Sequence, residues 1–105
     1  MRGKYGAKKT NYKGVNYDSK KEAEYAWELD QRVRNGEYKS YERQFKLSLD
    51  VNGQHITNYL VDFLVTTKTG EKEAHEVKGY QTDVWKIKWK LAQAIYGKEY
   101  KFIII

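Results

Sequence analysis

The chain has 105 residues, including 20 Lys or Arg, 14 Asp or Glu and two His, and its formal net charge is +6. This length fits one domain, the 40% hydrophobic and 15% aromatic content excludes an intrinsically disordered chain, and the absence of Cys excludes a disulfide framework or a thiolate zinc site. No apolar run reaches the roughly 18 residues of a transmembrane helix and no signal peptide is evident, so we expect a soluble intracellular domain with no membrane partner, whose charge favours nucleic acid or simply aids solubility.

Residues 1–16 are interpreted as a basic N-terminal arm in front of a single domain over residues 17–105. The arm has no acidic residue and no sustained helical or strand period, so we expect a mobile arm with at most a short strand at its end. Tyrosines between its lysines suit contact with phosphates, sugars or bases, and a solvated tail is an equal alternative. The expected nucleic-acid-binding residues are Lys4, Lys8, Lys9, Lys13, Lys20 and Lys86.

A helix is predicted to begin after Ser19 and to end near residues 35–36. Ser19 and Glu22 have the spacing of a capping box, and Asn-Gly is typical of a helix C-terminus. The buried stripe is expected to consist of Ala26, Leu29 and Val33, flanked by Ala23 and Tyr25. At 100° per residue, Glu22 lies within about 40° of the stripe residues, so its side chain is predicted to point at the sheet.

Three strands are predicted to follow as a meander. Residues 42–51 alternate apolar and polar, residues 52–53 are the Asn-Gly of a hairpin turn, and the return strand covers about 55–66. On the return strand, one face is expected to carry Tyr59, Val61, Phe63 and Val65, and the other Leu60, Asp62 and Leu64. Apolar residues on both faces indicate a central strand. A third strand is predicted over about 72–78.

The chain is predicted to end with a helix over residues 82–96 and a buried strand over residues 100–105. The apolar stripe of this helix is expected to hold Val84, Leu91 and Ile95, with Lys88 inside the stripe. The order helix, three-strand meander, helix, strand predicts an α/β fold around a small mixed sheet.

Asp62 is predicted in the middle of the central strand, where a carboxylate is costly unless it is paired, hydrogen-bonded or bound to a metal. Glu76 and Lys78 are two residues apart on the next strand, so they share a face and can converge on Asp62. Two repelling carboxylates suit Mg²⁺ or Mn²⁺, and a neighbouring lysine can orient a water and steady charge on a phosphate. These three residues are candidates for metal-assisted phosphodiester hydrolysis. The structural alternative is a buried Asp62–Lys78 salt bridge with Glu76 at its rim.

Four segments lie in a recognisable order on the predicted elements: residues 17–23 (YDSKKEA), 59–63 (YLVDF), 76–79 (EVKG) and 86–88 (KIK). In this order they resemble the PD-(D/E)XK nuclease superfamily, and most closely its compact phage-borne members related to Holliday junction resolvases. The resemblance covers roughly residues 14–105, with Val61 where the superfamily name has Pro.

The resemblance implies a restriction-endonuclease-like core in two layers, dependence on Mg²⁺ (or Mn²⁺) and cleavage of DNA. Asp62 and Glu76 would be metal ligands, and Lys78 would orient a water. Glu22 would be an accessory acid at the metal, and Lys88 would act at the scissile phosphate or in the acidic cluster. From the residues alone, Glu22 has the alternative of a simple helix cap, and Lys88 that of a lysine whose stem is buried and whose ammonium reaches water.

The sequence therefore favours a metal-dependent DNA endonuclease, selective for branched or four-way junction DNA. A resolvase makes two symmetric cuts, so a homodimer is expected, and a phage-encoded protein would act in the host cytoplasm. The alternatives are a nicking or restriction-like endonuclease and a non-catalytic nucleic-acid-binding module of the same fold.

Overall fold

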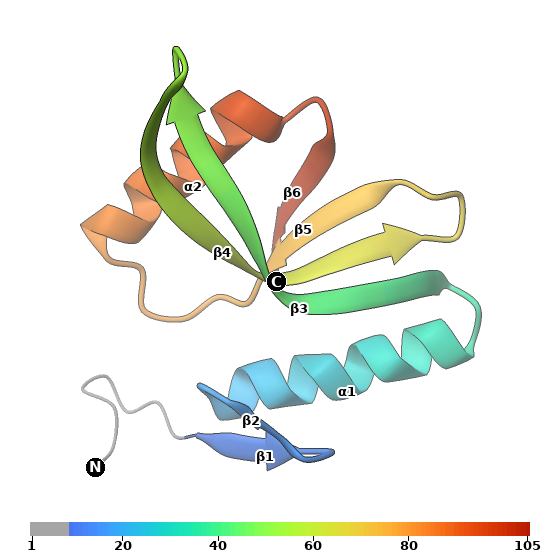
Figure 1. The fold of residues 1–105 in the computed structure, drawn as a ribbon. Coiled ribbons are helices and arrows are strands. Elements are labelled where there is room, and N and C mark those ends of the chain that lie inside the picture. Colours follow the sequence, from blue (N-terminus) through green and yellow to red (C-terminus); the bar gives the residue numbers. More distant parts are fainter. Residues whose placement is uncertain (1–8) are drawn as a thin grey trace.

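The structure, a computed structural model, describes residues 9–105 (Figure 1). The expectations for Lys4, Lys8 and the first half of the arm lie outside the described residues. No helix in residues 9–105 combines the length and apolar character needed to cross a membrane.

Residues 9–105 form an α/β fold, as predicted, with a four-stranded mixed sheet, a separate two-stranded sheet and two helices. The elements are β1 (Thr10–Tyr12), β2 (Val15–Tyr17), α1 (Lys20–Arg34), β3 (Tyr38–Val51), β4 (Gln54–Thr67), β5 (Lys72–Glu76), α2 (Asp83–Tyr96) and β6 (Tyr100–Ile104). In the order β3-β4-β5-β6, the first three strands form an antiparallel meander and β6 pairs parallel to β5.

Both helices begin and end as their sequences predict. The Ser19 hydroxyl oxygen accepts a hydrogen bond from the Glu22 backbone N–H at 3.1 Å, and Thr82 caps α2 in the same way. Gly36, directly after the C-cap of α1, has φ +78°, a conformation that glycine adopts without steric cost. The hairpin between β3 and β4 turns through Asn52 and Gly53, both with positive φ, as a type I′ turn requires.

The β3–β4 hairpin bends in its middle, and the sequence pattern did not predict this bend. Gln44 has φ +55°, and the ladder is interrupted there: Arg43 pairs with Phe63 and Phe45 with Val61, but the pair between them is missing. Side chains before and after the bend therefore change faces. Figure 1 shows the hairpin running along α1 and then turning towards α2.

The bend divides the buried residues into two cores on opposite faces of the sheet. Phe63 and Val65 pack with the helix α1, whereas Leu64 packs on the other face with the helix α2. Tyr59 and Val61 also belong to the α2 core, so the expectation that they share one face with Phe63 and Val65 is wrong. A helix on each face makes three layers, which corrects the two-layer arrangement that the resemblance implied.

Three further expectations need correction. Val84 is 62% exposed, because the buried face of α2 is centred on Trp89 and Ala92 rather than on the predicted stripe. The last strand is an edge strand with Ile104 and Ile105 exposed, not a buried one. β5 ends at Glu76, so Lys78 lies in the segment after the strand.

A hairpin of β1 and β2 covers the second half of the expected arm and packs on α1. Tyr17 at its end is 3% exposed in the α1 core. Asp30 of α1 accepts hydrogen bonds from Tyr12 at 2.5 Å and from Tyr41 at 2.7 Å, and it forms an ion pair with Lys13 at 3.5 Å. These contacts join the hairpin, α1 and β3 at one carboxylate.

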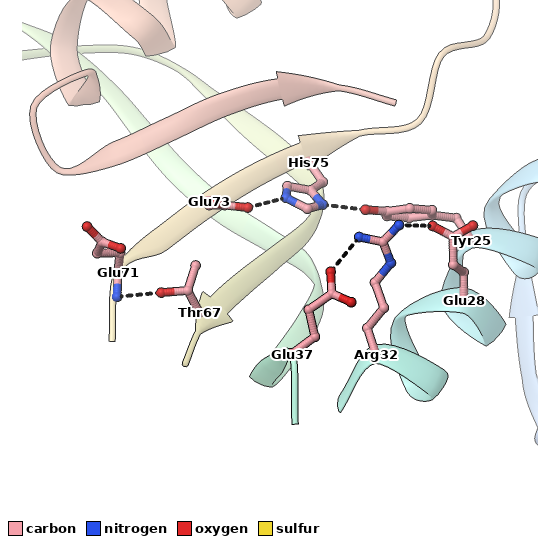
Figure 2. A network of polar contacts seen from close by, with 8 residues as sticks. All are labelled: Tyr25, Glu28, Arg32, Glu37, Thr67, Glu71, Glu73 and His75. Atoms are coloured by element: carbon pink, nitrogen blue, oxygen red, sulfur yellow. Dashed lines mark hydrogen bonds and ion pairs between the residues drawn. The ribbon is translucent and has the colours of Figure 1, made fainter. Parts of the chain in front are cut away.

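A second polar network joins α1 to β5 (Figure 2). His75, only 1% exposed, lies 2.6 Å from the Tyr25 hydroxyl through Nδ1 and 2.9 Å from Glu73 through Nε2. This arrangement suits a neutral imidazole that donates to Glu73 and accepts from Tyr25. His75 is therefore a packed core residue that fixes the strand directly before Glu76.

Candidate functional site

A pocket of about 230 Å³ opens where the start of α1, the bend of β4 and the end of β5 meet. Its lining residues are Asp18, Ser19, Glu22, Asp62, Glu76, Val77, Lys78, Gly79, Tyr80, Gln81 and Trp85. Four of the predicted site residues, Glu22, Asp62, Glu76 and Lys78, therefore line one cavity.

Asp62 and Glu76 are brought together by strand register. His75 pairs with Phe63 in the antiparallel ladder, so one residue further along the two strands Asp62 and Glu76 are opposite each other. Asp62 Oδ2 accepts a hydrogen bond from the Val77 backbone N–H at 2.9 Å, which fixes its carboxyl beside the chain of β5.

Glu76 is held by two aromatic donors. The Tyr59 hydroxyl donates to Oε1, and the Trp85 indole N–H donates to Oε2 at 3.0 Å. Tyr59 comes from β4 and Trp85 from the first turn of α2, so the α2 side of the sheet orients this carboxyl. Each carboxylate oxygen keeps a further lone pair for another ligand.

Glu22 approaches from the opposite side, on the first turn of α1. Its backbone N–H completes one half of the predicted capping box with Ser19. Among the hydrogen bonds of residues 9–105, the returning bond from the Ser19 amide to the Glu22 carboxylate is not found. Its half-buried carboxyl instead lies at the pocket, as the predicted position within the helical stripe requires.

Burial and mutual repulsion make these acids hard to ionise together. Burial, with the charge of Glu76 adding to it, raises the pKa of Asp62 to about 7. Burial and then the charges of Asp62 and Asp18 raise the pKa of Glu22 to about 7, against the opposing charge of Arg43. Burial also raises the pKa of Glu76, although its hydrogen bonds from Tyr59 and Trp85 oppose the rise. A bound cation would favour the ionised forms of these carboxyls, which burial first and then mutual repulsion oppose.

The donor set suits a hard cation, with two close protein ligands rather than three. Within the described chain, no three His, Cys, Asp or Glu side chains form a group that could hold a metal ion by themselves. Asp62 and Glu76 are the closely placed pair, and one or two carboxylates with several waters is the usual protein contribution to Mg²⁺.

Lys78 lies on the pocket wall with an exposed side chain. In the part of the chain that the structure describes, it forms no ion pair with Asp62, whose partners are the Val77 amide and the neighbouring carboxyl. The alternative of a buried Asp62–Lys78 salt bridge is therefore wrong. The Lys78 carbonyl oxygen accepts a hydrogen bond from the Lys21 ammonium at 3.0 Å, which ties this segment to the start of α1.

The other predicted lysines in the described part of the chain are not among the residues that line the pocket. Lys88 is half-buried one turn after Trp85 on α2 and is not among the lining residues. Lys20 and Lys86 are exposed next to the lining residues Ser19 and Trp85. Lys9 is exposed before β1, and Lys13 in the β1–β2 turn is paired with Asp30.

Sequence reasoning missed Tyr59 and Trp85 as partners of Glu76, and Asp18 and Arg43 as charges around Glu22. Trp85 had a usable signal, because a helix N-terminus that follows a strand closely can reach the end of that strand. Tyr59 had none, because it reaches the site only through the bend opposite Gln44.

Comparisons with curated proteins and with solved structures find no match. A family model described as "Protein of unknown function (DUF1064)" matches residues 2–104, which is nearly the whole chain. The chain therefore belongs to the DUF1064 family.

Proposed function

We propose that this protein is a divalent-metal-dependent DNA endonuclease that hydrolyses phosphodiester bonds. The observation that carries the proposal is the pair Asp62 and Glu76, placed opposite each other across two strands, half-buried in one pocket and raised in pKa by burial and repulsion. Structural ion-pair networks also shift pKa values, but among the described residues neither Asp62 nor Glu76 forms an ion pair, and a bound cation would relieve the repulsion between them.

The residues present fit Mg²⁺ or Mn²⁺, because all the candidate donors are carboxylate oxygens and the pocket also has room for water. Asp62 and Glu76 would hold the ion, and Glu22 would complete its surroundings from α1. Such an ion supplies charge stabilisation at a phosphoryl oxygen and activates water as a nucleophile.

The remaining groups have distinct roles in the proposal. Tyr59 and Trp85 fix the orientation of the Glu76 carboxylate through both of its oxygens. Lys78, whose exposed ammonium belongs to the pocket wall, orients the attacking water and stabilises charge on the phosphate. Exposed Lys20 and Lys86 contact backbone phosphates on either side of the pocket.

The element order supports a restriction-endonuclease-like core. The structure has a helix, a three-strand meander, a second helix and a parallel strand, with the carboxylate pair on the second and third strands of the meander. This is the order and placement that the resemblance to PD-(D/E)XK nucleases implies.

Branched or four-way junction DNA is the substrate we propose first, followed by nicking of ordinary duplex. A junction resolvase must cut two strands symmetrically, so the active form is proposed to be a two-fold homodimer. Light scattering on the protein with and without junction DNA tests this, and a monomer in both states favours nicking. A non-catalytic DNA-binding module remains the second candidate, because a net charge of +6 attracts a polyanion whether or not the protein cleaves it.

Purified protein should be incubated with plasmid, linear duplex, single strand and a four-way junction, in Mg²⁺ and in EDTA. We expect cleavage in Mg²⁺ only, with the junction cut fastest. Asp62→Asn and Glu76→Gln should reduce cleavage by at least about a hundredfold while DNA affinity changes little, because both preserve shape and hydrogen bonding.

Asp83→Asn is the matched control, since Asp83 is an exposed carboxylate on the first turn of α2 and does not line the pocket. Its cleavage rate should equal that of the wild type. Cleavage in EDTA, or full cleavage by Asp62→Asn, would reject the proposed chemistry.

A further inference from the structure

Arg43 occupies a special position on β3, directly before the bend. The positive φ of Gln44 breaks the alternation of side chains, so Arg43 faces α1 while Phe45 faces α2. Its guanidinium carbon lies 4.8 Å from the centre of the Tyr17 ring. Tyr17 is 3% exposed and directly precedes Asp18 on the wall of the pocket, so the guanidinium rests on a fixed aromatic surface.

The donors of Arg43 are unusual because they have no partner. Its Nε is buried without a hydrogen bond, and within residues 9–105 the guanidinium makes no hydrogen bond or ion pair. Arg32 shows the ordinary situation, with ion pairs to Glu28 at 3.1 Å and to Glu37 at 2.9 Å (Figure 2). Buried polar groups in folded proteins are nearly always hydrogen-bonded, so the buried and unsatisfied Nε of this half-buried arginine points to a ligand.

The charge of Arg43 acts on the acidic pocket without being neutralised by it. The guanidinium lies over the ring of Tyr17, whose chain neighbour Asp18 lines the pocket, and among the described contacts it forms no ion pair with Asp18 or Glu22. A cation held beside the pocket with its donors free attracts an anion at the pocket edge. A guanidinium matches phosphate in particular, because its planar fork can donate two parallel hydrogen bonds to two phosphate oxygens.

We propose that Arg43 binds a backbone phosphate of the nucleic acid at the edge of the pocket, with Tyr17 holding the guanidinium in place. This deepens the proposed function and rests on it only for the identity of the ligand as DNA. The proposal makes Arg43 a substrate-positioning residue rather than a catalytic one.

The test measures DNA binding by fluorescence anisotropy in EDTA, where no cleavage occurs, as a function of salt. Each phosphate contact contributes about 0.9 to the slope of log K against log salt for duplex DNA. Arg43→Gln should lower that slope by about 0.9 and weaken binding about tenfold at low salt. Arg43→Lys should keep the slope, because it keeps the charge. It should bind DNA more weakly, because lysine lacks the planar fork of the guanidinium.

Arg34→Gln is the matched control, because Arg34 is exposed at the far end of α1, about 18 Å along the helix from Glu22. Equal slopes for Arg43→Gln and Arg34→Gln would overturn the proposal. If Arg43→Gln fails to fold, unchanged affinity in Arg43→Lys would overturn it instead.

These outcomes separate the two proposals. A lowered slope in Arg43→Gln without cleavage by the wild type in any divalent metal supports the phosphate site and rejects the nuclease. Metal-dependent cleavage by the wild type, together with an unchanged salt slope in Arg43→Gln, rejects the Arg43 phosphate site and leaves the nuclease proposal standing.

Discussion

At Asp62, burial in the pocket disfavours the ionised form of the carboxyl. Its pKa is raised from 3.8 to about 7, with burial as the main cause. Between about pH 4 and pH 7 the folded protein therefore binds more protons than the unfolded chain, so this group makes the metal-free protein less stable as pH rises through that window. Below pH 4 both states are protonated and the effect disappears.

We predict that Asp62→Asn raises the free energy of unfolding in EDTA at pH 8 by about 1–3 kcal/mol and changes it little at pH 4. The amide keeps an oxygen for the Val77 N–H, so only the charge is lost. Urea denaturation at the two pH values measures the difference. A variant that is less stable than the wild type at pH 8 would refute the repulsion that we infer at the site.

Substitutions of Glu22 test whether its side chain only caps the helix or belongs to the site. The observed capping bond uses the backbone N–H of Glu22, which any residue supplies. We therefore predict that Glu22→Gln and Glu22→Ala both lower DNA cleavage at least about tenfold, without lowering the melting temperature. Glu24→Gln, exposed on the same helix turn, should behave as wild type in both measurements. Retained cleavage in Glu22→Gln, with a lower melting temperature only in Glu22→Ala, would mean that Glu22 is just a cap.

At the scale of elements, the bend of the β3–β4 hairpin positions the residues of β4 that form the site. Gln44 adopts φ +55° in the middle of a strand, a conformation that costs a non-glycine residue about 1 kcal/mol. We predict that Gln44→Gly stabilises the protein by up to about 1 kcal/mol, whereas Gln44→Val, whose branched side chain resists positive φ, destabilises it. Gln44→Ala controls for loss of the side chain. Equal effects of Gln44→Gly and Gln44→Ala on the free energy of unfolding would mean that the positive φ of Gln44 does not strain the backbone.

The link between α1 and β5 depends on neutral His75. Burial lowers the pKa of His75 below its ordinary 6.5, so the unfolded chain takes up the proton first as pH falls. The stability that the network contributes is complete above about pH 6.5 and is lost as pH falls below it. We predict that the stability difference between wild type and His75→Gln is largest at pH 7.5 and narrows by pH 5, as measured by thermal melts. A constant difference across this range would show that His75 titrates equally in both states.

The elements themselves follow closely from the sequence, and the site only partly. The cap at Ser19 and the Asn-Gly turn are local signals, and each produces the structure it predicts. The β1–β2 hairpin was missed because its turn places Lys13, rather than Asn or Asp, at positive φ. The change of faces at Gln44 was missed because strand alternation assumes a flat strand, and this bend depends on two cores that form far apart in the sequence.

On the scale of the whole molecule, a chain of net charge +6 encloses an acidic pocket between its two cores. The surface charge attracts a polyanion, while the carboxyls of Asp62 and Glu76 would repel the same polyanion unless a cation neutralises them. Substrate and metal are therefore expected to bind cooperatively, each reducing the repulsion that opposes the other.

Calorimetric titration of Mg²⁺ or Mn²⁺ into the metal-free protein at pH 7, in two buffers of different ionisation enthalpy, tests the metal site most directly. Because the pKa values of Asp62 and Glu22 are about 7, a cation that needs their ionised forms must expel protons as it binds. The account predicts saturable binding with proton release in the wild type and a loss of affinity of about tenfold or more in Asp62→Asn. Binding of equal strength in both proteins, or no binding by the wild type, would contradict it.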